Sequence, residues 1–483
     1  MKKALTWEEL ISLGIGCTIG AGIFVVTGRV AKNITGPALC LSYVFSGLAC
    51  LLSAFAYAEF ASINPSVGSA YGYTRSTFGK WGEFLGWIIG WDLVLEYAVT
   101  ASTVAQGWSN YLQRFLSFYG LYVDKKVSQT PFSYDPATGV LQSTGSIFDL
   151  PAFFITAVIT VLLMRGVKES ARFNNFMVVF KVIVVLFVIF TGCAYVQDKN
   201  YTPFMPYGLF GLSFFGYTAV GQTDAAGNSV GVLAGSSIVF FAYIGFDAVT
   251  NSAEETNNPG RDLPIGIIGS LLISTLLYIL VSLVIVGMVP YHEIDTDAPI
   301  STAFNDIGLH WAAVIVSFGA LAGLTSVLLV NLMGQPRILL AMARDGLLPK
   351  NLSDIHPVFK TPFNATAVTG IFVSLLASLI PLSILVEVVS MGTLSAFIFV
   401  NIGIIVLRRT QPHLVRPFEC PYVPWLPAAG AFICFMLMLS LPSTNWLRLV
   451  IWWGLGQIIY WCTKYRKPRI TEKYIEVQNV LHN

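Results

Sequence analysis

Three ionisable residues lie inside long apolar stretches of this chain, where they are placed to bind and release a proton. Asp92 and Glu96 are four residues apart in one stretch, so a helix would hold both on one face. Lys181 lies about three helical turns into another stretch. Ionisable groups are costly in an apolar medium, which makes each a candidate for function. If Glu96 and Lys181 approach each other, they form a pair that exchanges a proton; the alternative is a permanent strut that only fixes helix packing.

Four glycines interrupt the first apolar stretch, LGIGCTIGAGIF (13–24). A dinucleotide-binding fingerprint is disfavoured, because the spacing is GxGxxxG and no alternating strands and helices surround it. Gly16 and Gly20 also form a GxxxG pair, which lets two helices pack closely without further meaning. The third interpretation is a helix broken at mid-membrane, whose free main-chain amides and carbonyls line a cavity.

A second stretch, FFAYIGFDAVTNSAEE (240–255), matches the first, with Gly245 and the acidic Asp247 in an otherwise apolar run. We favour Asp247 as a cap on the exposed amides of the following half-helix over Asp247 as a ligand contact. Two broken helices would place their half-helix ends at the centre of a bundle. A positive N-terminal end then faces a carboxylate and a negative C-terminal end faces an ammonium group, so the predicted ligand is an amino acid.

Composition places these stretches in a lipid bilayer. The chain has 483 residues, of which 55% are hydrophobic and 11% are charged, with a mean hydropathy of +0.69. The net charge of +2, with no basic patch, argues against nucleic acid as a partner. The cysteine spacing suggests neither a disulfide framework nor a metal site, and the sequence has no HExxH motif. We therefore expect no metal, no cofactor and no catalytic residue, and a protein that is not an enzyme.

Apolar runs of about 20 residues predict twelve transmembrane helices in an all-α polytopic membrane protein. They cover roughly 8–31, 38–62, 81–115, 148–166, 172–196, 230–256, 263–289, 310–343, 363–381, 384–407, 425–441 and 445–463. With the N-terminus inside, the inner segments carry 20 basic residues and the outer segments carry 6. Both termini are therefore expected in the cytoplasm and the chain in the cell membrane. The polar stretch 122–146 is expected to be an external loop.

The first and sixth spans each open a block of five helices. Because five is odd, the second block enters the membrane in the opposite sense, which predicts a five-plus-five inverted repeat with helices 1 and 6 broken. The expected divisions are 1–200 for the first repeat, 201–410 for the second, and 411–483 for the last two helices and a cytoplasmic tail.

The chain resembles the amino acid-polyamine-organocation superfamily, and within it the cationic amino acid transporters of the bacterial twelve-helix type. Four segments carry the resemblance: GIGCTIGAGIF (14–24), GSAYGYTRSTFGKWGEFLGWIIGWDLVLEYA (68–98), FFAYIGFDAVTNSAEETNNPGRDLP (240–264) and GQPRILLAMARDGLLP (334–349). The family implies a LeuT-like fold and proton-linked or facilitated amino acid transport by alternating access. The implied partners are an amino acid, a proton and the lipid bilayer. Whether a small accessory membrane subunit also binds stays open.

The resemblance also implies a set of site residues. The substrate carboxylate is expected on amides around Gly20, Ala21 and Gly22, and the ammonium on carbonyls near Thr18, Ile19, Phe241, Ala242 and Ile244, with Ile23 beside them and Phe246 as an outer aromatic lid. Ordinary bundle core is the alternative for these apolar residues. In the family, a lysine at the position of Lys181 replaces the cation of sodium-coupled relatives, between the first, fifth and eighth spans. This implies transport that is independent of sodium.

Leu324, in the eighth span, stands where members that accept arginine and lysine tend to have a small or polar residue. A leucine shortens the pocket and offers no partner to a guanidinium group, so small or medium neutral amino acids are favoured. A cationic amino acid transporter and an exchanger are the alternatives, and a receptor or a channel is less favoured. The charges Glu254, Glu255 and Arg261 are expected to latch a cytoplasmic gate or to lie in a solvated loop, and Glu59 and Glu387 to make packing or gate contacts.

Overall fold

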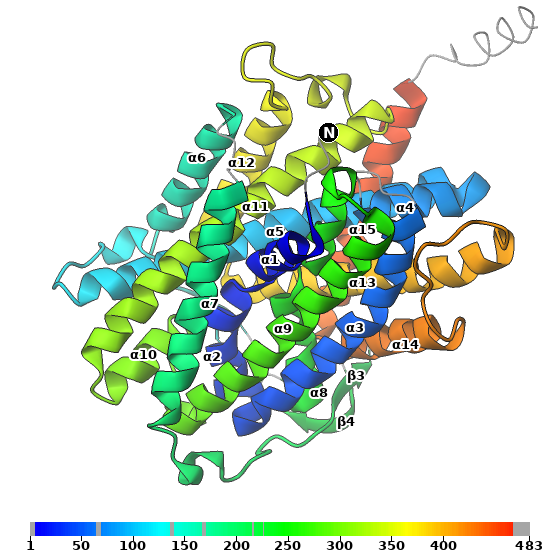
Figure 1. The fold of residues 1–483 in the computed structure, drawn as a ribbon. Coiled ribbons are helices and arrows are strands. Elements are labelled where there is room, and N and C mark those ends of the chain that lie inside the picture. Colours follow the sequence, from blue (N-terminus) through cyan, green and yellow to red (C-terminus); the bar gives the residue numbers. More distant parts are fainter. Residues whose placement is uncertain are drawn as a thin grey trace, which may run out of the picture.

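A computed structural model describes residues 5–63, 69–135, 140–166, 171–214, 217–225 and 227–466 (Figure 1). Helices dominate this part of the chain. The helices are α1 (Trp7–Thr18), α2 (Thr27–Val30), α3 (Leu39–Ile63), α4 (Ser69–Thr77), α5 (Gly82–Ser117), α6 (Leu150–Met164), α7 (Ala171–Cys193), α8 (Val232–Val239), α9 (Pro259–Met288), α10 (Pro299–Asp306), α11 (His310–Arg344), α12 (Phe363–Leu379), α13 (Leu382–Thr410), α14 (Trp425–Leu439) and α15 (Ser443–Arg466). The strands are β1 (Phe132–Asp135), β2 (Val140–Ser143), β3 (Gly211–Phe214), β4 (Tyr217–Thr223) and β5 (Ser229–Val230).

Several of these helices, alone or joined end to end, have the length and apolar composition of membrane spans. In the described part of the chain, seven helical stretches are long and apolar enough to cross a membrane, or eight if the bent pair α14 and α15 is one span. One of the seven, Trp7–Ile63, contains α1, α2 and α3. Two further apolar helices, α6 and α12, have 15 and 17 residues. The mostly helical membrane class is confirmed, while the number of twelve crossings stays a prediction.

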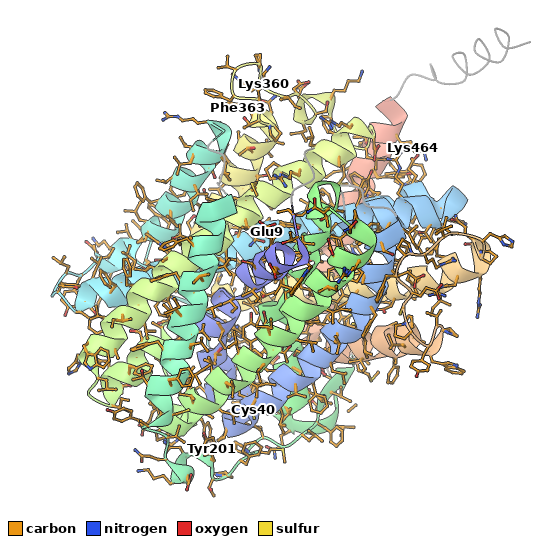
Figure 2. All side chains as sticks on the ribbon, in the orientation of Figure 1. Glu9, Cys40, Tyr201, Lys360, Phe363 and Lys464 are labelled. Carbon is orange, nitrogen blue, oxygen red and sulfur yellow. The ribbon has the colours of Figure 1, made fainter. Side chains whose placement is uncertain are left out.

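The two ends of the bundle differ in structure (Figure 1). At one end, Leu5 forms a β-bridge with Thr256, between the start of α1 and the start of α9. The described strands lie at the opposite end, where Figure 1 labels β3 and β4. Figure 2 labels Lys464 at the first end and Tyr201 at the second. We call these ends the N-terminal face and the strand face.

Two small antiparallel sheets cover part of the strand face. In one sheet β1 pairs with β2, and in the other β4 pairs with both β3 and β5. The side-chain amide of Asn228 donates to the Tyr134 hydroxyl on β1 at 2.9 Å, which joins the two sheets. The stretch expected to be a plain external loop therefore contains a hairpin. Its two strands have four residues each and β2 is exposed, so they lack the apolar alternation that would predict them.

Candidate functional site at the two helix breaks

The first break follows α1. The helix ends at Thr18, and Ile19 leaves helical geometry with φ −72° and ψ 97°. The chain resumes as a π-helical turn over Gly22–Val26, which leads into α2. Among the contacts of the described residues, the main-chain amides of Gly20 and Ala21 donate no hydrogen bond. Two adjacent free amides before a helical segment can bind an anion such as a carboxylate.

The second break separates two 3-10 segments, Phe240–Tyr243 and Phe246–Glu255. Between them, Ile244 has ψ 129° and Gly245 has φ 114°, a left-handed conformation that favours glycine. The amide of Ile244 donates to the carbonyl of Phe241 at 3.2 Å, whereas its own carbonyl oxygen accepts no hydrogen bond from the described residues. A free carbonyl at the end of a helical segment suits an ammonium group.

The two breaks are in direct contact with each other. A Cβ atom on Gly22 would lie 2.3 Å from the Cα atom of Ala242, so only glycine permits this approach. A Cβ atom on Gly245 would lie 3.1 Å from the Cβ atom of Cys17. The main chains of the two segments therefore approach as closely as their residues allow.

A tyrosine on α9 joins the two breaks. The hydroxyl oxygen of Tyr278 lies 2.7 Å from the carbonyl oxygen of Thr18 and 2.8 Å from that of Ala242. Because a hydroxyl carries one proton, it donates to one of these carbonyls at a time. The ring packs between Tyr43 and Tyr243, with centroid distances of 5.4 and 5.3 Å. Sequence reasoning missed Tyr278, although a hydroxyl inside the apolar run 263–289 was a usable signal.

Lys181 lies against the first break. Its side chain is fully buried on α7, and its ammonium group donates to the carbonyl of Gly16 at 2.6 Å and of Ile19 at 3.4 Å. A Cβ atom on Gly323 of α11 would lie 3.2 Å from the Cγ atom of Lys181. The lysine thus sits between α1, α7 and α11, which are the first, fifth and eighth predicted spans. This is the position that the family resemblance implies.

Glu96 bonds to α13, whereas Lys181 bonds to the first break. Its carboxylate accepts a hydrogen bond from Thr393 on α13 at 2.8 Å, and one helical turn away Asp92 accepts bonds from Ser395 and Trp453. The carboxylate of Glu96 also interacts electrostatically with that of Asp247. Lys181 donates hydrogen bonds to carbonyls of the first break and Glu96 accepts one from Thr393 of α13, and a proton-exchanging pair of the two stays a prediction.

Several expected site residues are buried around the first break. Leu324 is fully buried on α11, and a Cβ atom on Gly107 would lie 3.8 Å from both its Cδ1 atom and the Cβ atom of Ala21. Ile23 is also fully buried. The hydroxyl of Thr18 bonds to the carbonyl of Gly14 at 3.0 Å and to Ser274 at 2.8 Å. This hydroxyl is therefore engaged within the bundle.

Phe246 follows the second break, and its fully buried ring packs on two other rings. The centroid distances are 5.9 Å to Tyr57 of α3 and 5.4 Å to Phe397 of α13. Phe240 and Phe241 precede the break, toward the strand face. Phe246 thus lies on the half that continues to the N-terminal face, and its role as an outer lid stays a prediction.

An ion cluster lies near the N-terminal face, around the fully buried Glu59 at the end of α3. Arg408 of α13 donates to both carboxylate oxygens at 2.9 Å, and Arg416 lies 3.2 Å away. The amide of Cys420 adds a bond at 2.8 Å. Burial, and then the negative charge of Glu59, raise the pKa of the Cys420 thiol to about 12, so the thiol stays protonated. The cluster ties α3 to α13 and to the following loop.

A second ion cluster lies near the strand face, around Glu387 at the start of α13. Arg29 of α2 donates to its carboxylate at 3.1 Å, and Arg448 of α15 lies 3.6 Å away. The side-chain amide of Asn445 adds a bond at 3.2 Å. Glu59 and Glu387, expected to make packing or gate contacts, therefore each bind arginines, at opposite ends of α13.

The structure describes only one of the three side chains of the predicted cytoplasmic latch. The side chains of Glu254 and Glu255 lie outside the described residues. Arg261 lies exposed in the first turn of α9, and no ion pair involves it among the described residues. The latch made by these three residues stays a prediction.

Comparisons with known proteins agree on one class. A family model described as amino acid permease matches residues 5–463. The methylthioribose transporter of Bacillus subtilis (strain 168) is 43% identical over 95% of this chain and 93% of its own length. The branched-chain amino acid permease BcaP of the same organism is 43% identical over 98% and 95%. Cationic amino acid transporter 1 of Arabidopsis thaliana is 34% identical over 95% and 82%.

All these relatives are named as transporters or permeases and not as enzymes. The family match covers nearly the whole chain, including both helix breaks, Lys181 and the two ion clusters. The resemblance stated from the four sequence segments is thereby confirmed. The chain belongs to the amino acid permease family, within the amino acid-polyamine-organocation superfamily, and is an integral membrane protein of amino acid transport.

Proposed function

We propose that the protein carries small or medium neutral L-amino acids across the cell membrane by alternating access, without sodium and with proton coupling. The observation that carries this proposal is the meeting of two interrupted helices, with free amides at Gly20 and Ala21 and a free carbonyl at Ile244. Such main-chain groups complement the carboxylate and the ammonium of a zwitterion. Twelve spans, the five-plus-five inverted repeat and cytoplasmic termini belong to the same proposal.

The two ion clusters support alternating access. Glu59 ties α3 to α13 near the N-terminal face, and Glu387 ties α2 and α15 to α13 near the strand face. Both clusters are formed and the two breaks are in contact, which supports the proposal of a state closed toward both sides. Separation of the Glu387 cluster would open the strand face, and separation of the Glu59 cluster would open the N-terminal face. Each opening exposes the same central site.

Proton coupling is assigned to Lys181, with Glu96 as its predicted exchange partner. A charged ammonium group makes stronger hydrogen bonds than a neutral amine, so its charge decides how firmly α1 is held to α7 through Gly16 and Ile19. Loss of the proton weakens this attachment and frees the inner half of the first span to move. A positive charge held at this place also removes the need for a sodium ion.

The choice of neutral substrates rests on Leu324. Its fully buried isobutyl group stands beside Ala21 and Gly107 at the first break, where it limits length and offers no hydrogen bond. Two of the similar proteins are named for methylthioribose and for branched-chain amino acids, which fits a site without a partner for a cationic side chain. The name of the Arabidopsis relative keeps cationic amino acids as the alternative substrate class.

The test is uptake of radiolabelled amino acids into liposomes that contain the purified protein. We expect accumulation of neutral amino acids when the outside is made acidic, no change when potassium replaces sodium, and little uptake of arginine. Leu324→Ser should admit arginine, whereas Leu321→Ser, one turn earlier on α11, should not. Accumulation that needs sodium, or that ignores the proton gradient, contradicts the coupling; arginine uptake by the unaltered protein contradicts the substrate class.

A further inference from the structure

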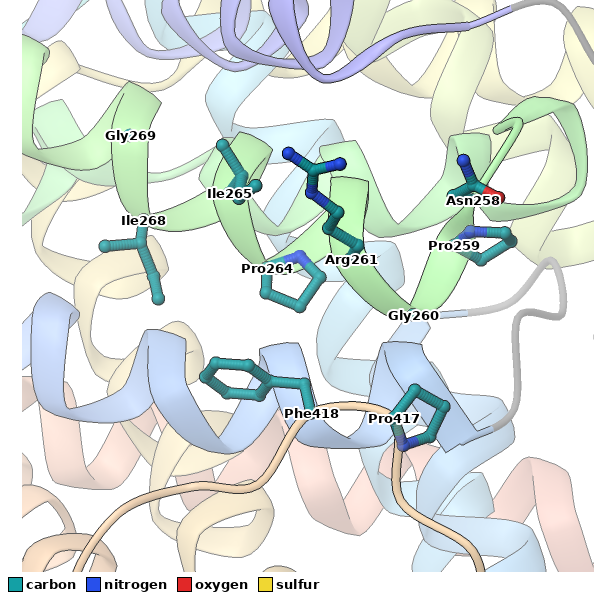
Figure 3. A pocket seen from close by; sticks show the side chains of 10 residues that line it. All are labelled: Asn258, Pro259, Gly260, Arg261, Pro264, Ile265, Ile268, Gly269, Pro417 and Phe418. Carbon is teal, nitrogen blue, oxygen red and sulfur yellow. The ribbon is translucent and has the colours of Figure 1, made fainter.

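A groove on the N-terminal face lies outside the transport site. It has a volume of about 860 Å³ and is formed by the first turns of α9 and by the loop after α13. Its lining residues are Asn258, Pro259, Gly260, Arg261, Pro264, Ile265, Ile268, Gly269, Pro417 and Phe418 (Figure 3). A cavity of this size can take a ligand as large as a drug molecule or an acyl chain.

The groove has one polar end and one apolar end. Figure 3 shows Asn258 toward one end and Ile268 and Gly269 toward the other, with Arg261 between them and Phe418 on the opposing loop. From Asn258 to Gly269 the helix rises about 16 Å, which is about half of the hydrocarbon thickness of a bilayer. The groove thus extends along α9 for about the thickness of one leaflet.

The polar lining of the groove carries one positive charge, that of Arg261, while the side chains of Glu254 and Glu255 lie outside the described residues. Arg261 is exposed and forms no ion pair among the described residues. The nearest acidic residue along the helix, Asp262, is buried and accepts from the amide of Asn258 at 3.3 Å. A single anionic group at the mouth would therefore complement Arg261.

From these observations we infer that the groove binds one anionic phospholipid, with its phosphate on Arg261 and an acyl chain along Pro264, Ile268 and Phe418. Basic pockets beside membrane helices on the cytoplasmic side are suited to acidic lipid head groups. A zwitterionic lipid would place its own cation near Arg261 and bind more weakly. Residues 1–4 do not suit the polar end, because Lys2 and Lys3 have the same sign as Arg261.

The site is placed to influence transport, because its walls belong to moving parts of the proposed mechanism. A Cβ atom on Gly269 would lie 2.9 Å from Ile11 of α1, so this helix packs on the first span. On the other wall, the amide of Phe418 donates a hydrogen bond to the Ser62 hydroxyl of α3 at 3.4 Å. A bound lipid would hold α9 and the loop after α13 together on the N-terminal face.

The test is native mass spectrometry of the full chain in detergent, titrated with phosphatidylglycerol or with phosphatidylcholine of the same chain length. We expect Arg261→Gln to weaken phosphatidylglycerol binding by about fivefold, as loss of one basic residue near a membrane surface does. Arg261→Lys should keep binding within about twofold, because the charge remains. Ile268→Trp should lower occupancy by filling the apolar end.

Two matched variants serve as controls. Arg337→Gln removes another exposed cation near the same face, and Ile273→Trp enlarges a side chain of α9 that is 41% exposed outside the groove. Both should bind phosphatidylglycerol as the unaltered protein does, and melting in phosphatidylcholine checks that every variant is folded. Equal affinity for the two lipids, displacement by excess inorganic phosphate, or equal losses in the control variants would overturn the inference.

Discussion

The centre of the molecule and its two ends hold charged groups in different ways. At the centre, the ammonium of Lys181 lies on main-chain carbonyls of the first broken helix. At the ends, Glu59 and Glu387 are held by arginine side chains. Main-chain groups at a break can bind a ligand directly, whereas side-chain ion pairs can separate as a unit. The comparison teaches that the centre is suited to binding and the ends to latching.

The largest expected effect comes from removing the central charge. Lys181→Ala leaves the carbonyl of Gly16 without its charge-assisted donor and removes the proposed proton carrier, so proton-driven accumulation in liposomes should fall by about 100-fold. Lys181→Arg is the matched variant, because it keeps a positive charge that does not release its proton. It should bind substrate and exchange it but fail to accumulate it. If the alanine variant keeps the pH dependence of uptake, Lys181 only fixes helix packing, and the proposed difference between the centre and the ends is wrong.

The next largest effect is expected at the Glu59 ion cluster near the N-terminal face. Glu59→Gln leaves Arg408 and Arg416 without their carboxylate partner, and breaking a buried pair in this way costs about 3–5 kcal/mol. We expect a lower melting temperature in detergent. Glu419→Gln is the control, since that carboxylate lies 3.4 Å from the same Arg408 but is largely exposed, and its loss should change stability by less than about 1 kcal/mol. Equal losses of stability in the two variants would show that burial does not decide the strength of the Glu59 ion cluster.

A third prediction tests the hydroxyl that binds main-chain carbonyls of the two breaks. Tyr278→Phe removes the hydroxyl that bonds to both breaks, and we expect the Michaelis constant for uptake to rise by about tenfold, as for loss of one buried hydrogen bond. Tyr201→Phe removes a hydroxyl bond of 2.8 Å to the carbonyl of Leu283, near the strand face, and serves as the control. A change in stability with no change in the Michaelis constant would assign Tyr278 to packing alone.

The smallest effect is expected at the Glu387 ion cluster near the strand face. Glu387→Gln weakens pairs with Arg29 and Arg448, and because the Glu387 side chain is 10% exposed and that of Glu59 is fully buried, the loss of stability should be smaller, at about 2 kcal/mol. Because solvent reaches this cluster, added salt should reduce the difference between variant and unaltered protein. A loss as large as that of Glu59→Gln, or one that salt does not change, would make the two ends equivalent.

Much of the helical fold could be predicted from the sequence, because membrane spans are long and apolar. The predicted range 81–115 compares with α5 at Gly82–Ser117, and 310–343 compares with α11 at His310–Arg344. The glycines at 14–22 and at 245 also predicted where the helices are interrupted. Glycine marks a break locally, through close approach at Gly22 and a positive φ at Gly245, so the sequence alone carries the signal.

The partners of the charged residues could not be predicted. Glu59 binds arginines 349 and 357 positions later in the chain, and Glu96 binds Thr393, 297 positions later. Such pairs depend on how α3, α5 and α13 pack, and no local pattern encodes that arrangement. The five strands were missed for a different reason, because they are short and stand in polar loops. Tyr278 was missed because a tyrosine in an apolar run resembles ordinary core.

One feature of α13 has a consequence for pharmacology. This helix is continuous over Leu382–Thr410 and carries Glu387 near its beginning and Arg408 near its end, about 32 Å apart by helical rise. A stiff rod of that length cannot release one end without altering the forces on the other. A blocker that never crosses the bilayer, and only engages Arg29 or Glu387 from one side, would therefore change how tightly substrate is held by carriers facing the opposite side. By thermodynamic reciprocity, substrate supplied from that opposite side would change the potency of the blocker by the same factor.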